Sequence, residues 1–182
     1  MRIKLIFAEQ NGESILLPLH YNSCIQGLLY GSITSSLSTQ LHDEGFPYKD
    51  RKFKLFTFSR ILQQGEVFFF NKQKYFIFRN GISFFLSSAM ENILSDVLEQ
   101  TIKKSVFRLN NQELVLQEAT IHSDPVFTTP MAIKMISPMT TYTTFYTEEK
   151  NKRVHYYNPW TKDFSHFLHQ NLLRKYAVIH QC

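Results

Sequence analysis

The chain is poor in cysteine and contains no long hydrophobic run. Its 182 residues include two cysteines, Cys24 and Cys182, which lie far apart in the sequence. This spacing excludes a dense disulfide framework and a Cys-type metal site, and it favours a reducing, cytoplasmic setting. No stretch approaches the roughly 20 apolar residues of a membrane-spanning helix, and the apolar run at 5–8 is too short for a signal peptide. We therefore expect a cytoplasmic protein without a membrane partner.

The chain also has little glycine and little charge. Six glycines occur and none follows Gly81, so the residues after 81 hold no glycine-rich loop. Charged residues make up 19%, too few for a disordered chain, whereas 43% are hydrophobic and 17 are Phe. This composition supplies the core of one domain, or of one small domain and part of another. The net charge of +5 suits a polyanionic partner, and RNA is favoured over a membrane because no basic amphipathic helix stands out.

The order of apolar patterns predicts an α+β fold of the ferredoxin-like class. Ile25, Leu29, Ile33 and Leu37 recur every four residues and predict one amphipathic helix over about 22–41. A second helix is expected from Ser88, after the Asn80-Gly81 hairpin signal. Expected strands occupy 2–8, 53–62, 67–70, 74–78, 82–86, 105–109 and 113–122. Together these elements make a β-α-β-β-α-β unit with an extra hairpin.

The remainder of the chain predicts a linker and part of a second unit. Residues 123–130 contain Asp124-Pro125 and Thr129-Pro130, which are typical of a linker. A strand at 132–136, a hairpin crossing the charged tip at 148–153, and a helix opened by Asn158-Pro159 follow. These elements make half of a ferredoxin-like unit, so we expect a first domain at 1–122 and an incomplete second one at 131–182. The chain is expected to be a fragment or a naturally shortened protein.

Several motifs in this order and spacing carry a family resemblance. They are Leu17-Pro18-Leu19-His20-Tyr21-Asn22, Gln26-Gly27-Leu28-Leu29-Tyr30, Leu41-His42-Asp43-Glu44-Gly45-Phe46, Phe53-Lys54-Leu55-Phe56-Thr57-Phe58-Ser59, Ser137-Pro138, Tyr156-Tyr157-Asn158-Pro159-Trp160 and Asn171-Leu172-Leu173-Arg174-Lys175-Tyr176. The chain resembles the CRISPR-associated endoribonucleases of the RAMP superfamily, which process repeat RNA. This resemblance implies two tandem ferredoxin-like domains and a C-terminal glycine-rich loop, and the loop is absent here.

The resemblance also implies a chemistry and its residues. The family cuts RNA without a metal or another cofactor, by attack of the ribose 2′-OH on the adjacent phosphate, and leaves a 2′,3′-cyclic phosphate and a 5′-OH. This reaction needs a base, an acid and a cation near the phosphate. His42 matches the family's catalytic His, Tyr30 its active-site Tyr and Lys54 its active-site Lys. CRISPR repeat RNA is the implied partner, and the cut RNA is expected to enter an interference complex.

Each of these residues also has a structural interpretation. His42 suits an exposed histidine at a helix C-terminus, where the dipole stabilises it, and Tyr30 suits an aromatic residue at the core edge. Lys52 competes with Lys54, because the two share a strand face by alternation. On one straight helix, Tyr30 and His42 would lie roughly 120° apart around the axis. They converge only if the chain turns back after Leu41.

Contacts to the RNA backbone are expected from basic side chains. Lys49, Arg51 and Lys52 precede the aromatic strand, and Lys152 and Arg153 lie at the charged hairpin tip. Ordinary solvated charges are the alternative for all five. The Phe-rich run at 67–86 suits base stacking, but hydrophobic runs this dense more often form core, and core is the default expectation.

Three functional interpretations follow. The first is a metal-independent endoribonuclease for CRISPR repeat RNA. The second is a non-catalytic RNA-binding or assembly module of a CRISPR complex. The third is a truncated, inactive homologue that forms a homodimer through the uncovered face of its second domain.

Overall fold

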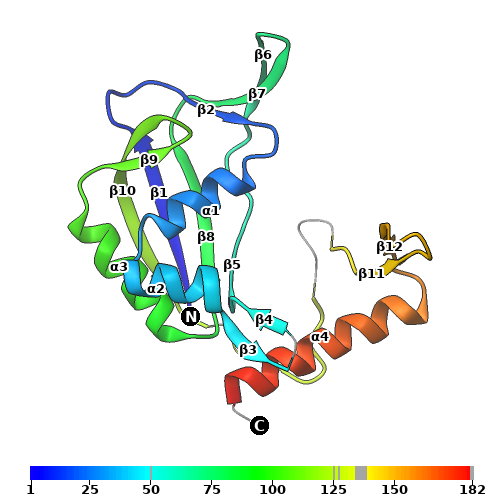
Figure 1. Cartoon of the computed structure of the whole chain (residues 1–182). Coiled ribbons are helices and arrows are strands. Elements are labelled where there is room, and N and C mark those ends of the chain that lie inside the picture. Colours follow the sequence, from blue (N-terminus) through cyan, green and yellow to red (C-terminus); the bar gives the residue numbers. More distant parts are fainter. Residues whose placement is uncertain (50, 125, 127, 134–138, 181–182) are drawn as a thin grey trace. The chain divides into compact units, whose positions relative to one another are not determined.

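The computed structural model describes residues 1–49, 51–124, 126, 128–133 and 139–180 (Figure 1). Most of the strand expected at 132–136, the Ser137-Pro138 motif and Cys182 lie outside the described residues. The chain divides into two compact units. Unit 1 comprises Met1–Phe46 and Lys54–Val126, and unit 2 comprises Pro47–Phe53 and Phe127–Cys182. Residues 47–53, which fall inside the predicted first domain, thus group with unit 2.

Unit 1 is built on a five-stranded antiparallel sheet of order β5-β8-β1-β10-β9 (Figure 1). Its strands are β1 (Arg2–Glu9), β5 (Phe56–Phe58), β8 (Ile82–Ser88), β9 (Phe107–Leu109) and β10 (Gln112–His122). Helix α1 (Asn22–Tyr30) lies between β1 and β5 in the chain, and α3 (Glu91–Lys103) lies between β8 and β10. Without β9, the order β1-α1-β5-β8-α3-β10 is the ferredoxin-like β-α-β-β-α-β unit. The predicted α+β fold is confirmed.

One face of this sheet forms the core. Alternation along β1 buries Ile3, Leu5 and Phe7, each at most 1% exposed. Side chains from α1 and α3, including Ile25 and Leu94, belong to the same buried cluster. Both helices therefore cover the same face, and removal of this apolar surface from water supplies the main stabilisation of the unit.

A second, three-stranded sheet of order β2-β7-β6 extends unit 1. It contains β2 (Ile15–Pro18), β6 (Glu66–Phe70) and β7 (Gln73–Phe78). Ile15, Leu17 and Phe78 join the core, so β2 and the end of β7 are anchored. All five positions of β6 are exposed, so the expectation that the Phe-rich run forms core is wrong for this strand.

The single helix predicted over 22–41 is interrupted. Helix α1 ends at Tyr30, and α2 (Ser35–Thr39) starts a new helical segment that ends in a π-helical turn, η1 (Gln40–Glu44). Between α1 and α2, hydrogen bonds from side chains to the backbone compete with the backbone hydrogen bonds of a continuous helix. Ser32 Oγ donates a hydrogen bond to the Leu28 carbonyl at 2.7 Å, and the Thr34 N–H donates to Asp96 Oδ2 at 2.8 Å. The apolar four-residue repeat that ends with Ile33 and Leu37 continues across this break, so the sequence pattern does not reveal the break.

The strand predicted over 53–62 is also shorter. Leu55 has a φ of 53°, a conformation that a strand does not contain, and it separates β4 (Arg51–Phe53) from β5. Ser88 Oγ donates to the Leu55 carbonyl at 2.9 Å and holds this kink. Because Ser88 still belongs to β8, α3 begins at Glu91 rather than at 88.

Unit 2 contains the β4 strand, most of its partner β3 (Phe46–Tyr48), the hairpin of β11 (Tyr142–Tyr146) and β12 (Lys152–Tyr156), and helix α4 (Lys162–His180). The predicted hairpin is confirmed. Helix α4 begins three residues after Pro159, because Asn158 forms a turn in which its Oδ1 accepts a hydrogen bond from the Trp160 N–H at 2.9 Å. Within the described part of the chain, no helix has the length and apolar character to cross a membrane.

We expect Gly81→Ala to destabilise unit 1 strongly. Gly81 has a φ of +80°, and an added Cβ would lie 2.4 Å from the Phe7 carbonyl oxygen. Gly12 has a similar φ of +78°, but its added Cβ would meet nothing within 4 Å. Gly12→Ala should therefore lose only about 1 kcal/mol of unfolding free energy from backbone strain. Gly81→Ala should lose at least about 2 kcal/mol more, because the neighbouring strand must move.

Urea unfolding of both variants measures this difference. Equal losses for the two variants would contradict the close contact between the Gly81 turn and β1.

Candidate active site

Three side chains that the sequence singled out lie together in unit 1. Lys54 Nζ donates a hydrogen bond to the Tyr30 hydroxyl at 2.8 Å. The Tyr30 and His42 rings meet edge to face, with centroids 5.8 Å apart. The residues come from three separate segments, the end of α1, the π turn η1 and the kink before β5. The fold thus gathers an imidazole, a phenol and an ammonium group in one place.

Tyr30 is held at the boundary between core and solvent. Its ring packs edge to face against Phe56 of β5, with centroids 6.1 Å apart, and it is half-buried. The neighbouring Leu29 is 4% exposed and anchors this end of α1 in the core. The apolar part of Tyr30 therefore fixes the ring, while its hydroxyl reaches Lys54.

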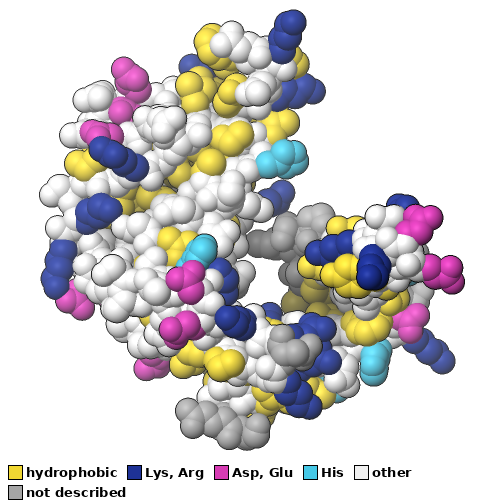
Figure 2. All heavy atoms as spheres, viewed as in Figure 1, with side chains coloured by type: hydrophobic (Ala, Val, Ile, Leu, Met, Phe, Trp, Pro, Cys, Tyr) yellow, Lys and Arg dark blue, Asp and Glu magenta, His cyan; other side chains and the backbone are white. Residues whose placement is uncertain are grey.

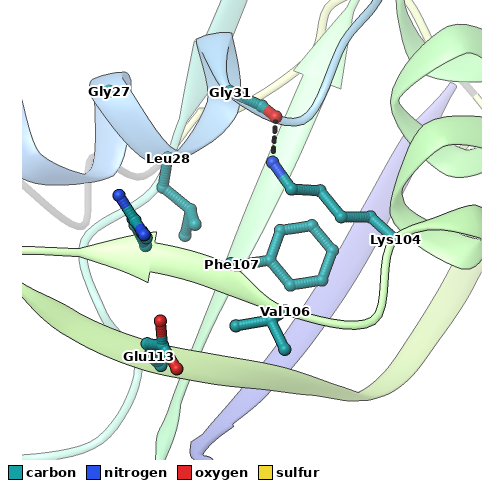
Figure 3. Close-up of a pocket in the computed structure, with 8 residues that line it drawn as sticks. Gly27, Leu28, Gly31, Lys104, Val106, Phe107 and Glu113 are labelled. Carbon is teal, nitrogen blue, oxygen red and sulfur yellow. Dashed lines mark hydrogen bonds between the residues drawn. The ribbon is translucent and has the colours of Figure 1, made fainter.

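A cation caps the helix end that carries Tyr30. Figure 3 shows Lys104 reaching from the end of α3 to the Gly31 carbonyl, to which its Nζ donates at 2.9 Å. The same Nζ lies 5.5 Å from the Phe107 ring centroid. A cavity of about 390 Å³ opens here, and Arg108 and Glu113 also line it. The Lys104 ammonium therefore satisfies a carbonyl at the C-terminus of α1, the helix end that carries Tyr30.

His42 is exposed, and its ring forms a hydrogen bond with the side chain of Asp43. Its side chain is 68% exposed, and Nδ1 lies 2.6 Å from Asp43 Oδ1. A carboxylate can only accept a hydrogen bond, so Nδ1 carries the hydrogen and the neutral ring keeps its lone pair on Nε2. Asp43 belongs to the motif quoted for His42, but the sequence analysis assigned it no role. Its contact indicates how the ring is oriented.

The approach of His42 to Tyr30 follows from the helix interruption. Twelve residues of continuous helix would separate the two Cα atoms by roughly 18 Å along the axis. Figure 1 shows that the chain changes direction between α1 and α2, at 31–34, rather than after Leu41 as the sequence suggested. Gly45, at a φ of 61°, then ends the π turn. Single π turns often occur at functional sites.

The kink at Leu55 separates Lys54 from Lys52. Lys54 lies outside both β4 and β5, so the alternation argument that placed the two lysines on one strand face does not apply. Lys54 Nζ lies 5.2 Å from the Tyr30 ring centroid and bonds to its hydroxyl, whereas Lys52 belongs to β4 and to unit 2. The structure thus brings Lys54 to Tyr30. Among the described residues, no three His, Cys, Asp or Glu side chains are grouped so that they could hold a metal ion.

In unit 2, basic side chains gather around one cavity. Lys49, Arg51 and Arg174 line a space of about 230 Å³ with Tyr48, and Lys49 Nζ lies 5.6 Å from the Tyr48 ring centroid. The sequence predicted Lys49 and Arg51 as RNA contacts but missed Arg174. Nothing in the local pattern of α4 links residue 174 to residue 51, because only the tertiary fold brings them together.

Lys152 and Arg153 lie elsewhere in unit 2. They are the first residues of β12 and do not line this cavity, and the connecting turn comprises 147–151. Lys152 pairs with Tyr146 and Arg153 with Phe145. As neighbours on a strand, their side chains point to opposite faces of the hairpin. Both are exposed.

Comparisons with known proteins place the chain in a family. The family model for the CRISPR-associated protein Cas6 N-terminal region matches residues 16–120, and the model for the Cas6 C-terminal region matches residues 122–182. A search of curated protein sequences found no match.

Solved structures share the fold. One, described as "CRISPR associated protein Cas6", is 21% identical with a TM-score of 0.68, covering 100% of this chain and 72% of that one. A second, "Characterization of a Cas6-related gene from Pyrococcus furiosus", is 19% identical with a TM-score of 0.69, covering 99% and 71%. A third, "An RAMP protein binding different RNA substrates", is 18% identical with a TM-score of 0.71, covering 97% and 70%.

These identities establish the fold, whereas the family models establish descent. The N-terminal model alone spans more than half of the chain, and the C-terminal model continues to its last residue. The chain therefore belongs to the CRISPR-associated Cas6 family, a family of endoribonucleases that process CRISPR repeat RNA.

Proposed function

We propose that this chain is a metal-independent endoribonuclease that cleaves CRISPR repeat RNA, with His42, Tyr30 and Lys54 as its active site. One observation carries the proposal. Three side chains from separate segments, matching the family's motif positions, converge through the 2.8 Å Lys54–Tyr30 hydrogen bond and the 5.8 Å Tyr30–His42 ring contact. We also propose that residues 1–122 and 131–182 are two domains joined by 123–130, and that the first carries the chemistry.

His42 supplies the base of the reaction. Asp43 holds the ring through Nδ1, so Nε2 is free to take the proton of the ribose 2′-OH. The 2′-oxygen attacks the adjacent phosphorus and the bond from phosphorus to the 5′-oxygen breaks. The products are a 2′,3′-cyclic phosphate and a 5′-OH. The exposure of His42 leaves room for a polymeric substrate.

Lys54 and Tyr30 act on the phosphate and on the leaving group. The Lys54 ammonium stabilises the negative charge that builds up on the phosphate oxygens. The Tyr30 hydroxyl accepts a hydrogen bond from Lys54 and therefore keeps its own hydrogen for donation. That proton passes to the departing 5′-oxygen, and Lys54 replaces it. Solvent then returns His42 and Lys54 to their starting protonation states, and the side chains supply the base, the acid and the cation.

RNA is held by the cations of unit 2 in this proposal. Lys49, Arg51 and Arg174 surround one cavity, and an RNA backbone supplies the phosphates that such a cluster binds. Lys52, Lys152 and Arg153 add further positive charge. The cut RNA then stays bound and passes to an interference complex, as the family resemblance implies.

We expect His42→Ala to slow cleavage severely while RNA binding is retained. Loss of a general base lowers the rate about 10²- to 10⁴-fold. The measurement is single-turnover cleavage of end-labelled repeat RNA in EDTA, together with a gel-shift assay. His169→Ala is the matched control, because His169 is another exposed histidine and lies on α4. Cleavage by His42→Ala at the wild-type rate would contradict the proposal, and RNA that is bound but uncut by the wild type would indicate a binding module.

Lys54→Ala should reduce the cleavage rate about 10²-fold, because the phosphate loses its cation and Tyr30 its hydrogen-bond partner. Lys52→Ala should change the rate much less, since Lys52 belongs to β4 in unit 2. Single-turnover rates at saturating protein separate chemistry from binding. If Lys52→Ala proves the more damaging variant, the assignment of the active-site cation is reversed.

Arg51→Gln and Arg174→Gln should weaken RNA binding without changing the saturating cleavage rate. Each lost phosphate contact lowers the slope of log affinity against log salt by about 0.7 for single strands. Titrations at several salt concentrations measure this slope. Lys175→Gln is the control, because Lys175 neighbours Arg174 but does not line the cavity. An unchanged slope for both arginine variants would show that the side chains lining this cavity do not contact RNA.

A further inference from the structure

The β6–β7 hairpin carries apolar surface that the fold does not use. Val67, Phe68, Phe69 and Phe70 are 45–61% exposed although they follow one another in a single strand. In Figure 1 the hairpin extends away from the five-stranded sheet of unit 1, and Figure 2 shows hydrophobic and basic side chains together at this end. Contiguous exposed apolar surface of this kind marks an interaction site.

The two faces of the hairpin differ. Register places Phe68 opposite Tyr75 and Phe70 opposite Gln73, so these four side chains share the face away from the core. The Phe68 and Phe70 rings are nearly parallel, at 15°, with centroids 6.4 Å apart. The two rings therefore offer a pair of nearly parallel aromatic faces to a flat ligand.

The hairpin carries an excess of positive charge. The Arg79 guanidinium makes two hydrogen bonds to the Glu66 carboxylate, at 3.1 and 2.8 Å, and lowers the pKa of that carboxyl, so Glu66 is ionised and paired. Lys72 and Lys74 form no ion pair within the described residues. Lys74 shares the opposite face with Phe69, and its Nζ lies 5.6 Å from the centroid of that ring, so Lys72 is the charge nearest to the Phe68 and Phe70 face. Positive φ angles at Asn71 and Lys72 form a tight turn that places Lys72 at the tip.

We propose that this hairpin is a second RNA-contact surface. Unpaired bases stack on Phe68 and Phe70, and Lys72 at the tip of the hairpin contacts an adjacent phosphate. The inference rests on the proposed RNA substrate and extends it to an unpaired segment. Single-stranded RNA offers both the flat rings and the negative charge that this surface complements. A second copy of the chain would instead bring like charges to the surface.

The stacking component is tested in a His42→Ala background, so that the RNA stays intact. The probe is a fluorescent, unstructured pyrimidine-rich RNA oligonucleotide, and anisotropy gives its Kd. Phe68→Leu with Phe70→Leu keeps the apolar area but removes the ring faces, and it should raise Kd about tenfold or more. Phe68→Tyr with Phe70→Tyr keeps the ring faces and should stay within about twofold.

The phosphate component is tested with Lys72→Gln, which should lower the salt slope by about 0.7, whereas Lys74→Gln on the opposite face should leave it unchanged. Ile102→Ala is the matched control for loss of an exposed apolar side chain, because Ile102 is 72% exposed on α3. Light scattering on each variant reports the oligomeric state.

The outcomes separate this proposal from the proposed function. A wild-type Kd for the double leucine variant overturns the stacking surface, even where His42-dependent cleavage is seen. The proposal is also overturned if the protein is a dimer that persists in Phe68→Leu with Phe70→Leu but dissociates in Phe68→Ser with Phe70→Ser. The hairpin would then bind a second copy of the chain through its apolar area. Weakened binding by the leucine variant, with no cleavage by the wild type, supports the hairpin and overturns the nuclease.

Discussion

The hydrogen bond from the Thr34 N–H to the Asp96 carboxylate determines where the first helical segment stops and where the next begins. Without this interruption, Tyr30 and His42 would lie far apart on one straight helix. With it, the chain reverses and the His42 ring reaches the Tyr30 ring. Asp96 lies on α3, so the second helix of the ferredoxin-like unit sets the geometry of the site carried by the first. The arrangement of the proposed active site therefore depends on the shared apolar face that fixes α1 and α3 on the sheet.

Backbone conformations that interrupt the regular helix and strand surround the site. Leu55 occupies the left-handed region, and its carbonyl is held by Ser88 from the neighbouring strand. The π turn carries His42, and Gly45 ends it at a positive φ. A left-handed conformation at a non-glycine residue such as Leu55 costs of order 1–3 kcal/mol and persists only where the surrounding structure fixes it. Together these interruptions place three reactive side chains on segments that a regular helix and a regular strand would hold apart.

The sequence predicted what depends on local pattern. Alternation in β1 and the four-residue repeat of Ile25 and Leu29 identified the ferredoxin-like unit, and motif order identified the family. The helix break, the kink at Leu55 and the cluster of Arg174 with Arg51 were missed, because each depends on contacts between distant residues. The exposure of β6 was also missed, since a run of phenylalanines has the same pattern in a core and on a surface. The convergence of His42, Tyr30 and Lys54 was anticipated only through the family resemblance.

The most direct test of the central claim uses repeat RNA with a single 2′-deoxyribose immediately before the scissile phosphate, in EDTA. The account predicts that this RNA binds normally and stays uncut, whereas the all-ribose RNA gives one product that ends in a 2′,3′-cyclic phosphate and one that begins with a 5′-OH. Cleavage of the deoxy-substituted RNA at an undiminished rate, or products with 3′-OH and 5′-phosphate ends, would contradict attack by the 2′-OH and the roles assigned to His42, Tyr30 and Lys54.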